Sequence, residues 1–335
     1  MIILDGKEAG GQTLRSALSL SAITQQPFTI KNIRGARPNP GLEAQHLAAV
    51  RAMQEICNAT VKGSTLHSPT LEFIPNEIQP GTYELDIGTA GSTTLLLQTV
   101  IPALIKADKP TRMIALGGTD TLHALPSMDF QEVFLEYLTM IGIDTTCEIA
   151  SYGFYPKGQG RIILEVIPAP ILRKLELKKR GKFQEASISS YCSDALQKKR
   201  VAERMAQACK ENLKEKGEIL TDMKYKATAS PGGFVNAHVH FENAIISQTC
   251  LAELKKTAEE VGRECAKLLN QELATDSTAD HFTADQLMIY FALAGSGFVR
   301  VSQVTEHMKT NARVIEEFLP VKFSFDENIL RCEKK

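Results

Sequence analysis

Helix-like and strand-like patterns of apolar residues alternate along the first half of the chain. A first helix is predicted by apolar residues at helical spacing, Leu14, Ala17, Leu18 and Ala22. A strand at 28–30, a loop rich in Arg, Gly and Pro at 34–40, a second helix and a strand near 71–74 complete this unit. The same helix–strand–helix–strand order recurs between residues 88 and 166.

A third unit of this order lies near the C-terminus. One helical face is formed by Leu287, Tyr290, Phe291 and Ala294, and Gly295 ends that helix. A strand at 298–301, a loop with His307, another helix and a strand at 321–325 follow. We therefore predict an α/β (α+β) fold of three repeated helix–strand–helix–strand units, each of roughly 60–75 residues. Chance alternation in an ordinary α/β protein is the alternative.

The stretch between the second and third units differs in composition. Residues 182–275 are rich in Lys and Glu and contain two helical patterns, about 194–216 and about 251–269, with an alternating strand at 235–241. Such a shift predicts a small inserted α/β domain whose ends lie close together. The predicted large catalytic domain is then 1–181 plus 276–335, and the inserted small domain is 182–275.

Composition restricts the class of protein. The 335 residues are 43% hydrophobic and 23% charged, which is ordinary for a globular protein and excludes a mainly disordered chain. No apolar run is long enough to span a membrane. The first residues do not resemble a signal peptide, so we expect a cytoplasmic location and no membrane partner. The seven cysteines form no CxxC pair, and we expect reduced thiols.

The charge balance limits nucleic-acid contacts to local ones. Lys and Arg number 38 and Asp and Glu 39, for a net charge of −1, so there is no general basic excess. Aromatic residues are only 6% of the chain and Trp is absent, which disfavours a broad base-stacking surface. The basic run 198–200 lies on a predicted helix. It is either a solvated face or a basic strip for RNA.

Equivalent loops in the three units carry candidate chemistry. Each follows a strand and precedes a helix N-terminus, where free N–H groups favour phosphate. The loops carry Arg34 and Arg37, then the segment 117–120, then His307. Packing of the units around a pseudo-threefold axis would bring these loops together. Arginines, a glycine-rich backbone and a histidine then indicate phosphoryl or nucleotidyl transfer.

His307 is the sharpest single candidate. A helix N-terminus lowers the pKa of a histidine and keeps its imidazole neutral and nucleophilic, although a surface-loop histidine is the alternative. Glu8, beside a glycine turn, either holds Mg²⁺ or is a solvated turn residue. Arg15 either faces phosphate or pairs with a surface acid. The glycine-containing segment 88–92 lacks the spacing of a P-loop.

With these residues in view, the chain closely resembles the RNA 3′-terminal phosphate cyclases. The resemblance covers most of the chain outside 182–275. It is carried by segments 4–6, 8–16, 33–37, 40–42, 45–47, 88–92, 97–99, 117–120, 153–158, 284–287, 292–295, 310–311 and 318–320 and by His307.

The resemblance implies a fold and a reaction. The fold is a threefold repeat like that of the enolpyruvate transferases, with a small inserted α/β domain. The reaction is that of a ligase: ATP-dependent conversion of an RNA 3′-phosphate end to a 2′,3′-cyclic phosphate, releasing AMP and pyrophosphate. It proceeds through a covalent His–AMP intermediate and an adenylylated RNA end, with Mg²⁺ or Mn²⁺ as the metal and RNA 3′-phosphate ends as the partner. Whether the chain forms a homo-oligomer is left open.

The resemblance also implies residue roles. His307 matches the nucleophile, and Glu8 matches a position near the metal and nucleotide phosphates. Arginines expected to hold the RNA or ATP phosphates are Arg15, Arg34 and Arg37. Residues matching the adenine-nucleotide pocket are Gln98, Phe282, Thr283, Ala284, Asp285 and Gln286. Asp285 orients either His307 or the metal.

Some positions depart from the family pattern. Phe282 stands where Tyr is common, so stacking on adenine is kept and a hydroxyl is lost. Ala9 replaces a glycine of the first turn, which narrows the backbone's choices. The residues at 121–123, Leu125 and Gln159 also differ, and they leave the nucleotide-pocket wall in question.

Two rival functions remain open. One is a non-catalytic cyclase-like protein of ribosomal RNA processing, which shares the fold but lacks the nucleophilic histidine. The other is a small-molecule transferase on the same repeat fold. His307 opposes the first, and the segments 8–15 and 307–311 oppose the second.

Overall fold

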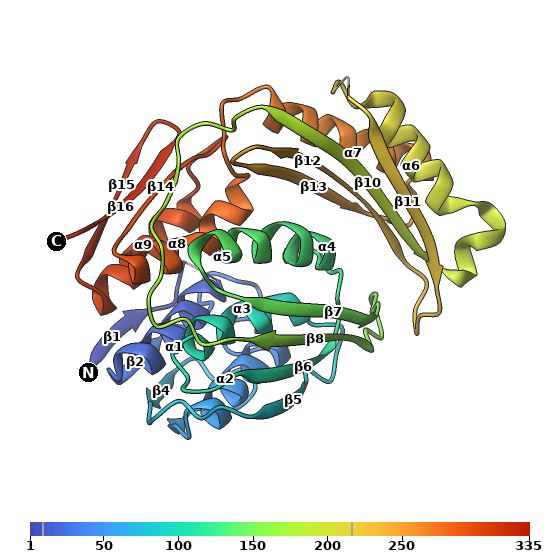
Figure 1. Ribbon diagram of the computed structural model, residues 1–335. Coiled ribbons are helices and arrows are strands. Elements are labelled where there is room, and N and C mark those ends of the chain that lie inside the picture. The colour runs from blue at the N-terminus through green and yellow to red at the C-terminus, as the bar shows by residue number, and fades with distance from the viewer. Residues whose placement is uncertain (9, 216) are drawn as a thin grey trace.

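Three of the sheets in this protein share one topology. The computed structural model describes residues 1–8, 10–215 and 217–335. Within these ranges the strands form four mixed sheets of four strands each. In three of them the first two strands pair in parallel and the last two add in antiparallel orientation. The predicted α/β fold with a threefold repeat is therefore confirmed (Figure 1).

Each repeat has the order strand–helix–strand–helix–strand–strand. The first comprises β1 (Ile2–Asp5), α1 (Gln12–Thr24), β2 (Phe28–Lys31), α2 (Ala44–Ile56), β3 (Thr60–Lys62) and β4 (Leu71–Ile74). The second comprises β5 (Thr82–Asp86), α3 (Thr93–Leu104), β6 (Thr111–Gly117), α4 (Ser127–Asp129), the π-helical turn η1 (Phe130–Phe134), α5 (Leu135–Ile141), β7 (Thr145–Ser151) and β8 (Gly160–Val166). The third comprises β9 (Leu175–Leu177), α8 (His281–Ala294), β14 (Ser296–Arg300), α9 (Glu306–Phe318), β15 (Val321–Asp326) and β16 (Ile329–Lys334).

Helices from different repeats pack together between the sheets. Helix α1 contacts α2, α3 and α9, and α8 contacts α3 and α9. Their apolar residues belong to one hydrophobic cluster that extends from Leu4 to Cys332. Burial of such continuous apolar surface is the main force that holds the repeats together. The packing also brings the N-terminal parts of α1, α8 and α9 into one region.

Side-chain caps define where the helices around this region begin. The hydroxyl of Ser92 accepts the N–H of Leu95 at the start of α3, and Thr305 accepts the N–H of Met308 at the start of α9. The carboxylate of Asp280 does the same for α8. Each cap satisfies an amide that the helix itself leaves unpaired. Gly295 ends α8 in the left-handed conformation, as its position in the sequence predicts.

A fourth sheet with two helices interrupts the third repeat between β9 and α8. It comprises β10 (Phe183–Ser193), the 3₁₀ turn η2 (Asp194–Lys199), α6 (Val201–Asn212), β11 (Ile219–Lys226), β12 (Gly233–Phe241), β13 (Ile245–Leu251) and α7 (Ala258–Leu273). Helices α6 and α7 cover its outer face in Figure 1, while β13 contacts α4 and η1 on the other side. A separate hydrophobic cluster fills the space under the two helices. The buried residues of this cluster all lie within the predicted inserted domain at 182–275, whose boundaries stay a prediction.

Several predicted elements need correction. A leading strand in each repeat (β1, β5 and β9) and the strand β16 escape the sequence pattern, because such short runs carry too few apolar residues to show a period. The predicted helix at 194–216 is instead a 3₁₀ turn and α6, separated by Arg200 in the left-handed conformation. The predicted helix at 251–269 begins only at Ala258, where Thr257 caps it.

Two other expectations were tested. All seven cysteines are free thiols, as predicted. Among the described residues, none of the helices has both the length and the apolar character needed to cross a membrane.

Candidate active site

His307 and Asp285 form the centre of the polar region between the repeats. His307 is the second residue of α9, and its Nδ1 lies 2.8 Å from Oδ2 of Asp285 on α8. The aspartate side chain is 6% exposed and the histidine side chain 45% exposed. An ionised carboxylate can only accept, so the ring donates its Nδ1 proton, and in the neutral tautomer the lone pair is then on Nε2. The pair therefore fixes the orientation of the imidazole and leaves Nε2 without a partner from Asp285.

A hydrogen-bond network holds Asp285 from the other side. The Asn311 amide nitrogen lies 3.3 Å from Oδ1 of Asp285, and the Gln286 amide nitrogen lies 3.2 Å from Oδ2. Oδ1 of Asn311 accepts the hydroxyl of Ser16 at 2.7 Å, which crosses from the third repeat to the first. A carboxylate with several donors has its rotamer fixed by them. The histidine is consequently positioned by residues of both repeats.

Arg15 brings a partly buried positive charge to this network. Its Nη2 donates to Oε1 of Gln12 at 2.6 Å, and the Gln12 amide nitrogen lies 3.3 Å from the hydroxyl of Ser16. Burial lowers the pKa of Arg15 to about 10, and the Asp285 carboxylate opposes that shift. The guanidinium therefore stays charged at neutral pH. A partly buried, charged guanidinium is a strong binding group for phosphate.

Gln98 faces this site without hydrogen-bond partners. It lies on α3 and is buried, yet both atoms of its amide lack a partner among the described residues, and so does the hydroxyl of Tyr290. A small pocket between α1, α3, α8 and α9 is lined by both residues together with Arg15, Gln286 and Asn311. Buried polar atoms are usually paired, and unpaired ones point to a missing ligand or water. The structure thus brings the predicted residues Gln98, Gln286, Asp285, Arg15 and His307 to one place.

Arg34 and Arg37, the two arginines of the loop at 34–40, differ in how far their guanidinium groups are already occupied by protein partners. Arg34 donates to the carbonyl oxygens of Asn39 and Gly41 and forms an ion pair of 2.6 Å with Glu43. Arg37 is exposed, and its guanidinium packs beside Gly10 at the turn before α1. Arg37 is therefore available to an anion, whereas Arg34 mainly stiffens its loop.

His46 is a site residue that the sequence argument did not single out. It is the third residue of α2, and its Nδ1 accepts the N–H of Glu43 at 3.2 Å, so its proton is on Nε2. Burial, followed by the charges of Arg15 and Arg34, lowers the pKa of His46 to about 3 and keeps it neutral. A Cβ on Gly11 would overlap Nε2 of His46 and lie 2.8 Å from Nη1 of Arg15. Only glycine allows this close approach of imidazole and guanidinium to the turn.

Other predicted residues have structural or peripheral positions. Thr283 bonds to Asp280 at the start of α8, and Ala284 is fully buried, so neither side chain reaches open space. Phe282 is 59% exposed, and its ring centroid lies 4.0 Å from that of His281. Its exposed face leaves room for a further ring. The departure at Ala9 lies outside the described residues.

Glu8 provides one carboxylate next to the glycine turn. It is exposed in the loop before α1. No group of three or more His, Cys, Asp or Glu side chains in the described ranges could hold a metal ion. A divalent ion at Glu8 would therefore take most of its oxygen ligands from a bound phosphate or from water, as Mg²⁺ commonly does.

The glycine-rich segment 117–120 is not the phosphate cradle that the sequence predicts. The N–H of Gly118 donates to Gly91 and that of Thr119 to Gly153, at 2.8 and 2.9 Å. The carboxylate of Asp120 accepts from Ser127 and is buried. These amides are already paired, so they cannot bind an anion. The glycines allow the backbones of neighbouring strands and loops to touch.

Comparison with known proteins agrees with this description. The family model RTC, "RNA 3′-terminal phosphate cyclase", matches residues 6–325. An RNA 3′-terminal phosphate cyclase from Koribacter versatilis (strain Ellin345) is 38% identical over 329 residues, covering 98% of this chain and 92% of the relative. An EPSP synthase structure from Acinetobacter baumannii gives a TM-score of 0.30 at 12% identity, covering 100% of this chain and 64% of that one. A TM-score this low does not show a shared fold.

Fold and site together define a threefold α/β repeat protein with a histidine–aspartate pair and a partly buried arginine at the junction of its first and third repeats. The match over residues 6–325 and the 38% identity are decisive for its relationship. The chain belongs to the RNA 3′-terminal phosphate cyclase family.

Proposed function

We propose that the chain is an active RNA 3′-phosphate cyclase that uses ATP and adenylylates its own His307. The observation that carries this proposal is the contact of 2.8 Å between Nδ1 of His307 and the buried carboxylate of Asp285. It orients a half-exposed imidazole at the N-terminus of α9, and in the tautomer with its proton on Nδ1 the Nε2 lone pair can act as the nucleophile.

The chemistry explains why a covalent intermediate is useful. A phosphate monoester is a poor electrophile with a poor leaving group. In the proposed first step Nε2 bonds to the α-phosphorus of ATP and pyrophosphate leaves. The RNA 3′-phosphate then takes the adenylyl group from His307. Finally the neighbouring 2′-hydroxyl attacks that phosphate and AMP leaves, which is fast because attacker and target share one ribose.

The site residues divide between the two substrates in this proposal. Gln98 and Gln286, which line the small pocket between α1, α3, α8 and α9, contact the nucleotide in this proposal, and the unpaired amide of Gln98 supports this role. Phe282 stacks on adenine. Thr283 and Ala284 act through the backbone at the start of α8. Asp285 orients His307 in preference to a metal, since its carboxylate is already occupied by three side chains.

Phosphate binding falls to the arginines and to His46. Arg15 and Arg37 hold the anion, and Arg34 positions the loop that carries Arg37. His46 adds a neutral N–H donor between them. Glu8 is the single proposed protein ligand for Mg²⁺ or Mn²⁺, which would neutralise charge on the triphosphate when bound.

The two rival functions make different demands on these residues. A non-catalytic cyclase-like protein of RNA processing has no need for an oriented histidine, and the His307–Asp285–Asn311 network speaks against it. A small-molecule transferase on this repeat fold would not need the arginine loop at 34–37. A cytoplasmic location stays a prediction, and the oligomeric state stays open.

A product assay tests the proposal. The protein is incubated with an RNA oligonucleotide bearing a 3′-phosphate, with ATP and Mg²⁺ or Mn²⁺, and the end is examined by resistance to phosphatase. We expect a phosphatase-resistant 2′,3′-cyclic end that requires ATP. A reaction confined to DNA ends, or an absent product, would refute the RNA cyclase proposal.

A further inference from the structure

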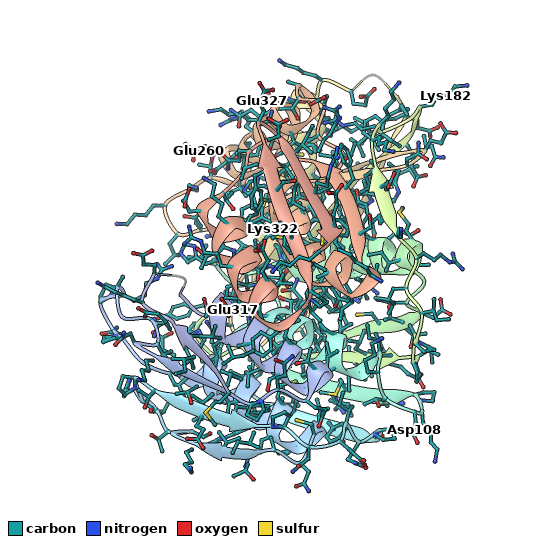
Figure 2. All side chains as sticks on the ribbon, turned by 90° about the vertical axis from the view of Figure 1, so that its left-hand side faces the viewer. Asp108, Lys182, Glu260, Glu317, Lys322 and Glu327 are labelled. Atoms are coloured by element: carbon teal, nitrogen blue, oxygen red, sulfur yellow. The ribbon has the colours of Figure 1, made fainter. Side chains whose placement is uncertain are left out.

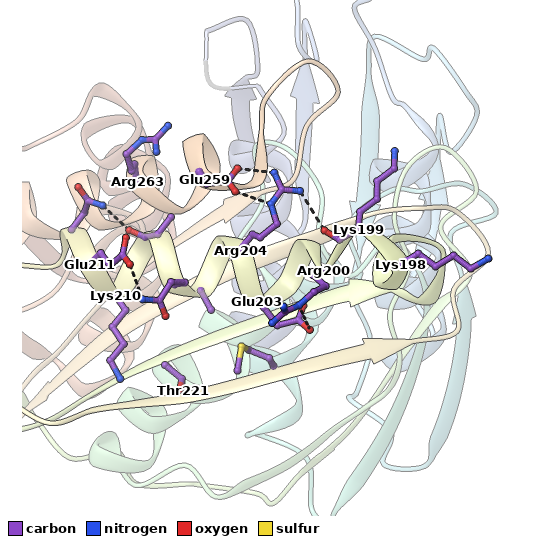
Figure 3. A pocket seen from close by; sticks show the side chains of 15 residues that line it. Lys198, Lys199, Arg200, Glu203, Arg204, Lys210, Glu211, Thr221, Glu259 and Arg263 are labelled. Carbon is purple, nitrogen blue, oxygen red and sulfur yellow. Dashed lines mark hydrogen bonds and ion pairs between the residues drawn. The ribbon is translucent and has the colours of Figure 1, made fainter.

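A groove on the inserted domain carries positive charge that the proposed active site does not use. It runs along α6, between η2, the strand β11 and the helix α7, and has a volume of about 610 Å³ (Figure 3). We call it the α6 groove. Six basic side chains line it: Lys198, Lys199, Arg200, Arg204, Lys210 and Arg263.

The charge of the α6 groove is positive in a chain that is slightly negative overall. The groove has three carboxylates, Glu203, Glu211 and Glu259, against six cations, so the difference is +3, whereas the whole chain is −1. A local excess of this size in a nearly neutral protein creates a field that attracts polyanions.

The carboxylates of the groove are already engaged by neighbours. Glu259 receives two hydrogen bonds from Arg204, at 2.7 and 2.8 Å. The hydroxyl of Tyr225 donates to Glu203, and the amide of Gln207 donates to Glu211. Two of the three carboxylates also form ion pairs with cations of the groove, Glu203 with Arg200 and Glu259 with Arg204.

Lys198 and Lys199 remain available for a ligand. Both are exposed at the end of η2, and in the described part of the chain neither forms an ion pair. In Figure 3 their side chains extend away from the groove wall, while Arg204 turns to Glu259. None of the described residues that line the groove is aromatic. A ligand would thus be held by its backbone phosphates and not by stacked bases.

Contacts between loops connect the active site with this pair of lysines. Beside His46, the side chain of Gln45 accepts the N–H of Ser92 at 3.4 Å. Gly158 packs against Ala90 in the same loop, so that a Cβ there would lie 2.9 Å from the Ala90 Cα. The tip of the β7–β8 hairpin therefore contacts the loop at 88–92, which lies next to His46 of the active site.

The hairpin tip in turn touches the inserted domain. The N–H of Lys157 donates to the hydroxyl of Ser230 at 3.1 Å, and the N–H of Ser193 donates to Gly232 at 2.8 Å. Ser193 caps η2, which ends in Lys198 and Lys199. Lys157 itself is exposed on this path. Touching segments thus lead from the loop beside His46 through the β7–β8 hairpin tip to η2, and Lys157 is the exposed cation between them; we call this line the Lys157 edge.

We propose that this edge guides the RNA body and that the α6 groove binds its backbone phosphates. The inference rests on the proposed function, because it needs an RNA whose 3′ end lies near His307. A chain that ends there leaves the site along this edge, and its upstream phosphates meet Lys157 and then Lys198 and Lys199. Binding of this kind is independent of base sequence and sensitive to salt. The connection to the site proposed for the RNA end favours RNA over an acidic peptide.

Two double variants test the proposal. Lys198→Glu with Lys199→Glu reverses the charge at the groove. Lys106→Glu with Lys109→Glu makes the same change in net charge next to the start of β6, the end of that strand that is away from the β7–β8 hairpin tip. Figure 2 shows Asp108, between these two lysines, far from Lys182 at the start of the inserted domain. The ligands are fluorescent RNAs with a 3′-hydroxyl, one of about 20 nucleotides and one of about 3. Their Kd values are measured by anisotropy at several salt concentrations, without ATP.

The proposal predicts a length-dependent effect. For the long RNA, Kd rises about tenfold in the groove variant, and the slope of log Kd against log salt becomes shallower by about 1.4, which is about 0.7 for each of the two lost phosphate contacts. For the short RNA, Kd stays within twofold, and the control variant binds both RNAs like the wild type. Equal weakening by both variants, unchanged binding of the long RNA, or equal competition by polyglutamate would overturn the proposal.

Activity distinguishes this inference from the proposed function. In the groove variant, KM for a long 3′-phosphorylated RNA rises about tenfold, whereas kcat and the labelling of the protein by ATP are unchanged. If the charge reversal perturbs folding, the neutral double variant Lys198→Gln with Lys199→Gln replaces it. We expect KM for the long RNA to rise in that variant too, by a smaller factor. Loss of ATP labelling in the wild type itself would refute the proposed function and not the groove.

Discussion

The hydroxyl of Ser16 donates to Oδ1 of Asn311 at 2.7 Å and so joins two helices whose residues are 295 positions apart. Asn311 in turn donates to Asp285, the partner of His307. The orientation of the proposed nucleophile on α9 therefore depends on the docking of α1 from the first repeat. A buried network of this kind is sensitive to the loss of any one member.

Replacing Asp285 by Asn should nearly abolish self-adenylylation. The amide can donate to Nδ1 of His307, which places the imidazole proton on Nε2 and removes the nucleophilic lone pair. We expect a loss on the order of 10²–10⁴-fold in labelling rate by ATP. Asp280→Asn is the matched control, because it changes a buried cap of the same helix and keeps an accepting oxygen. Equal labelling rates in the two variants would contradict the orienting role.

Replacing Gln98 by Met should stabilise the fold and weaken the binding of the nucleotide. The Gln98 amide is buried without partners, and its removal saves about 1–3 kcal/mol of desolvation cost. We expect a higher Tm without ligand and a KM for ATP raised about tenfold. Gln12→Met is the comparison: its amide bonds to Arg15 and Ser16, so that change should lower Tm. A lower Tm in Gln98→Met, with KM unchanged, would remove Gln98 from the nucleotide site.

Replacing Gly11 by Ala should weaken the binding of the RNA phosphate more than the reaction with ATP. The new Cβ would overlap Nε2 of His46 and crowd the guanidinium of Arg15. We expect KM for a short 3′-phosphorylated RNA to rise about tenfold or more, with protein labelling by ATP reduced much less. At Gly81 the nearest atom to an added Cβ is 3.6 Å away, so Gly81→Ala should be neutral. An unchanged KM in Gly11→Ala would show that His46 and Arg15 do not bind the RNA phosphate.

The buried His46 should make the fold sensitive to acid. Its pKa is lowered from 6.5 to about 3 in the folded chain, so between these values only the unfolded chain binds the proton. Stability is then complete above about pH 6.5 and falls as the pH drops toward 3, by up to about 1.4 kcal/mol per pH unit. Urea unfolding at pH 7, 6 and 5 should show a shallower loss for His46→Gln. If the free energy of unfolding falls equally with pH in the wild type and in His46→Gln, protonation of His46 does not cause the acid sensitivity.

The sequence predicts those parts of the fold that repeat over many residues. Helix α1 shows its apolar face at helical spacing, and Gly295 ends α8, because both features depend on local geometry. Strands such as β9, with three residues, have no period to recognise. The break at Arg200, an exposed residue in the left-handed conformation, has no signal in the helical pattern of the sequence.

The site is predictable in its residue types more than in its contacts. His307, Asp285, Arg15 and Gln98 follow from the resemblance, and the structure places them together. The Ser16–Asn311 bond spans the chain and has no local signal. His46 could have been suspected from its place in the first turn of a helix after an arginine-rich loop. The glycines at 117–118 were misassigned because glycines that bind phosphate and glycines that pack backbones look alike in a sequence.

The central claim is that His307 becomes covalently adenylylated. The most direct measurement is incubation with α-labelled ATP and Mg²⁺ or Mn²⁺, followed by proteolysis and mass spectrometry of the labelled peptide. We predict one acid-labile AMP adduct on the peptide that contains His307 in the wild type and no adduct in His307→Asn. An unlabelled wild type, or an equal label in His307→Asn, would contradict it.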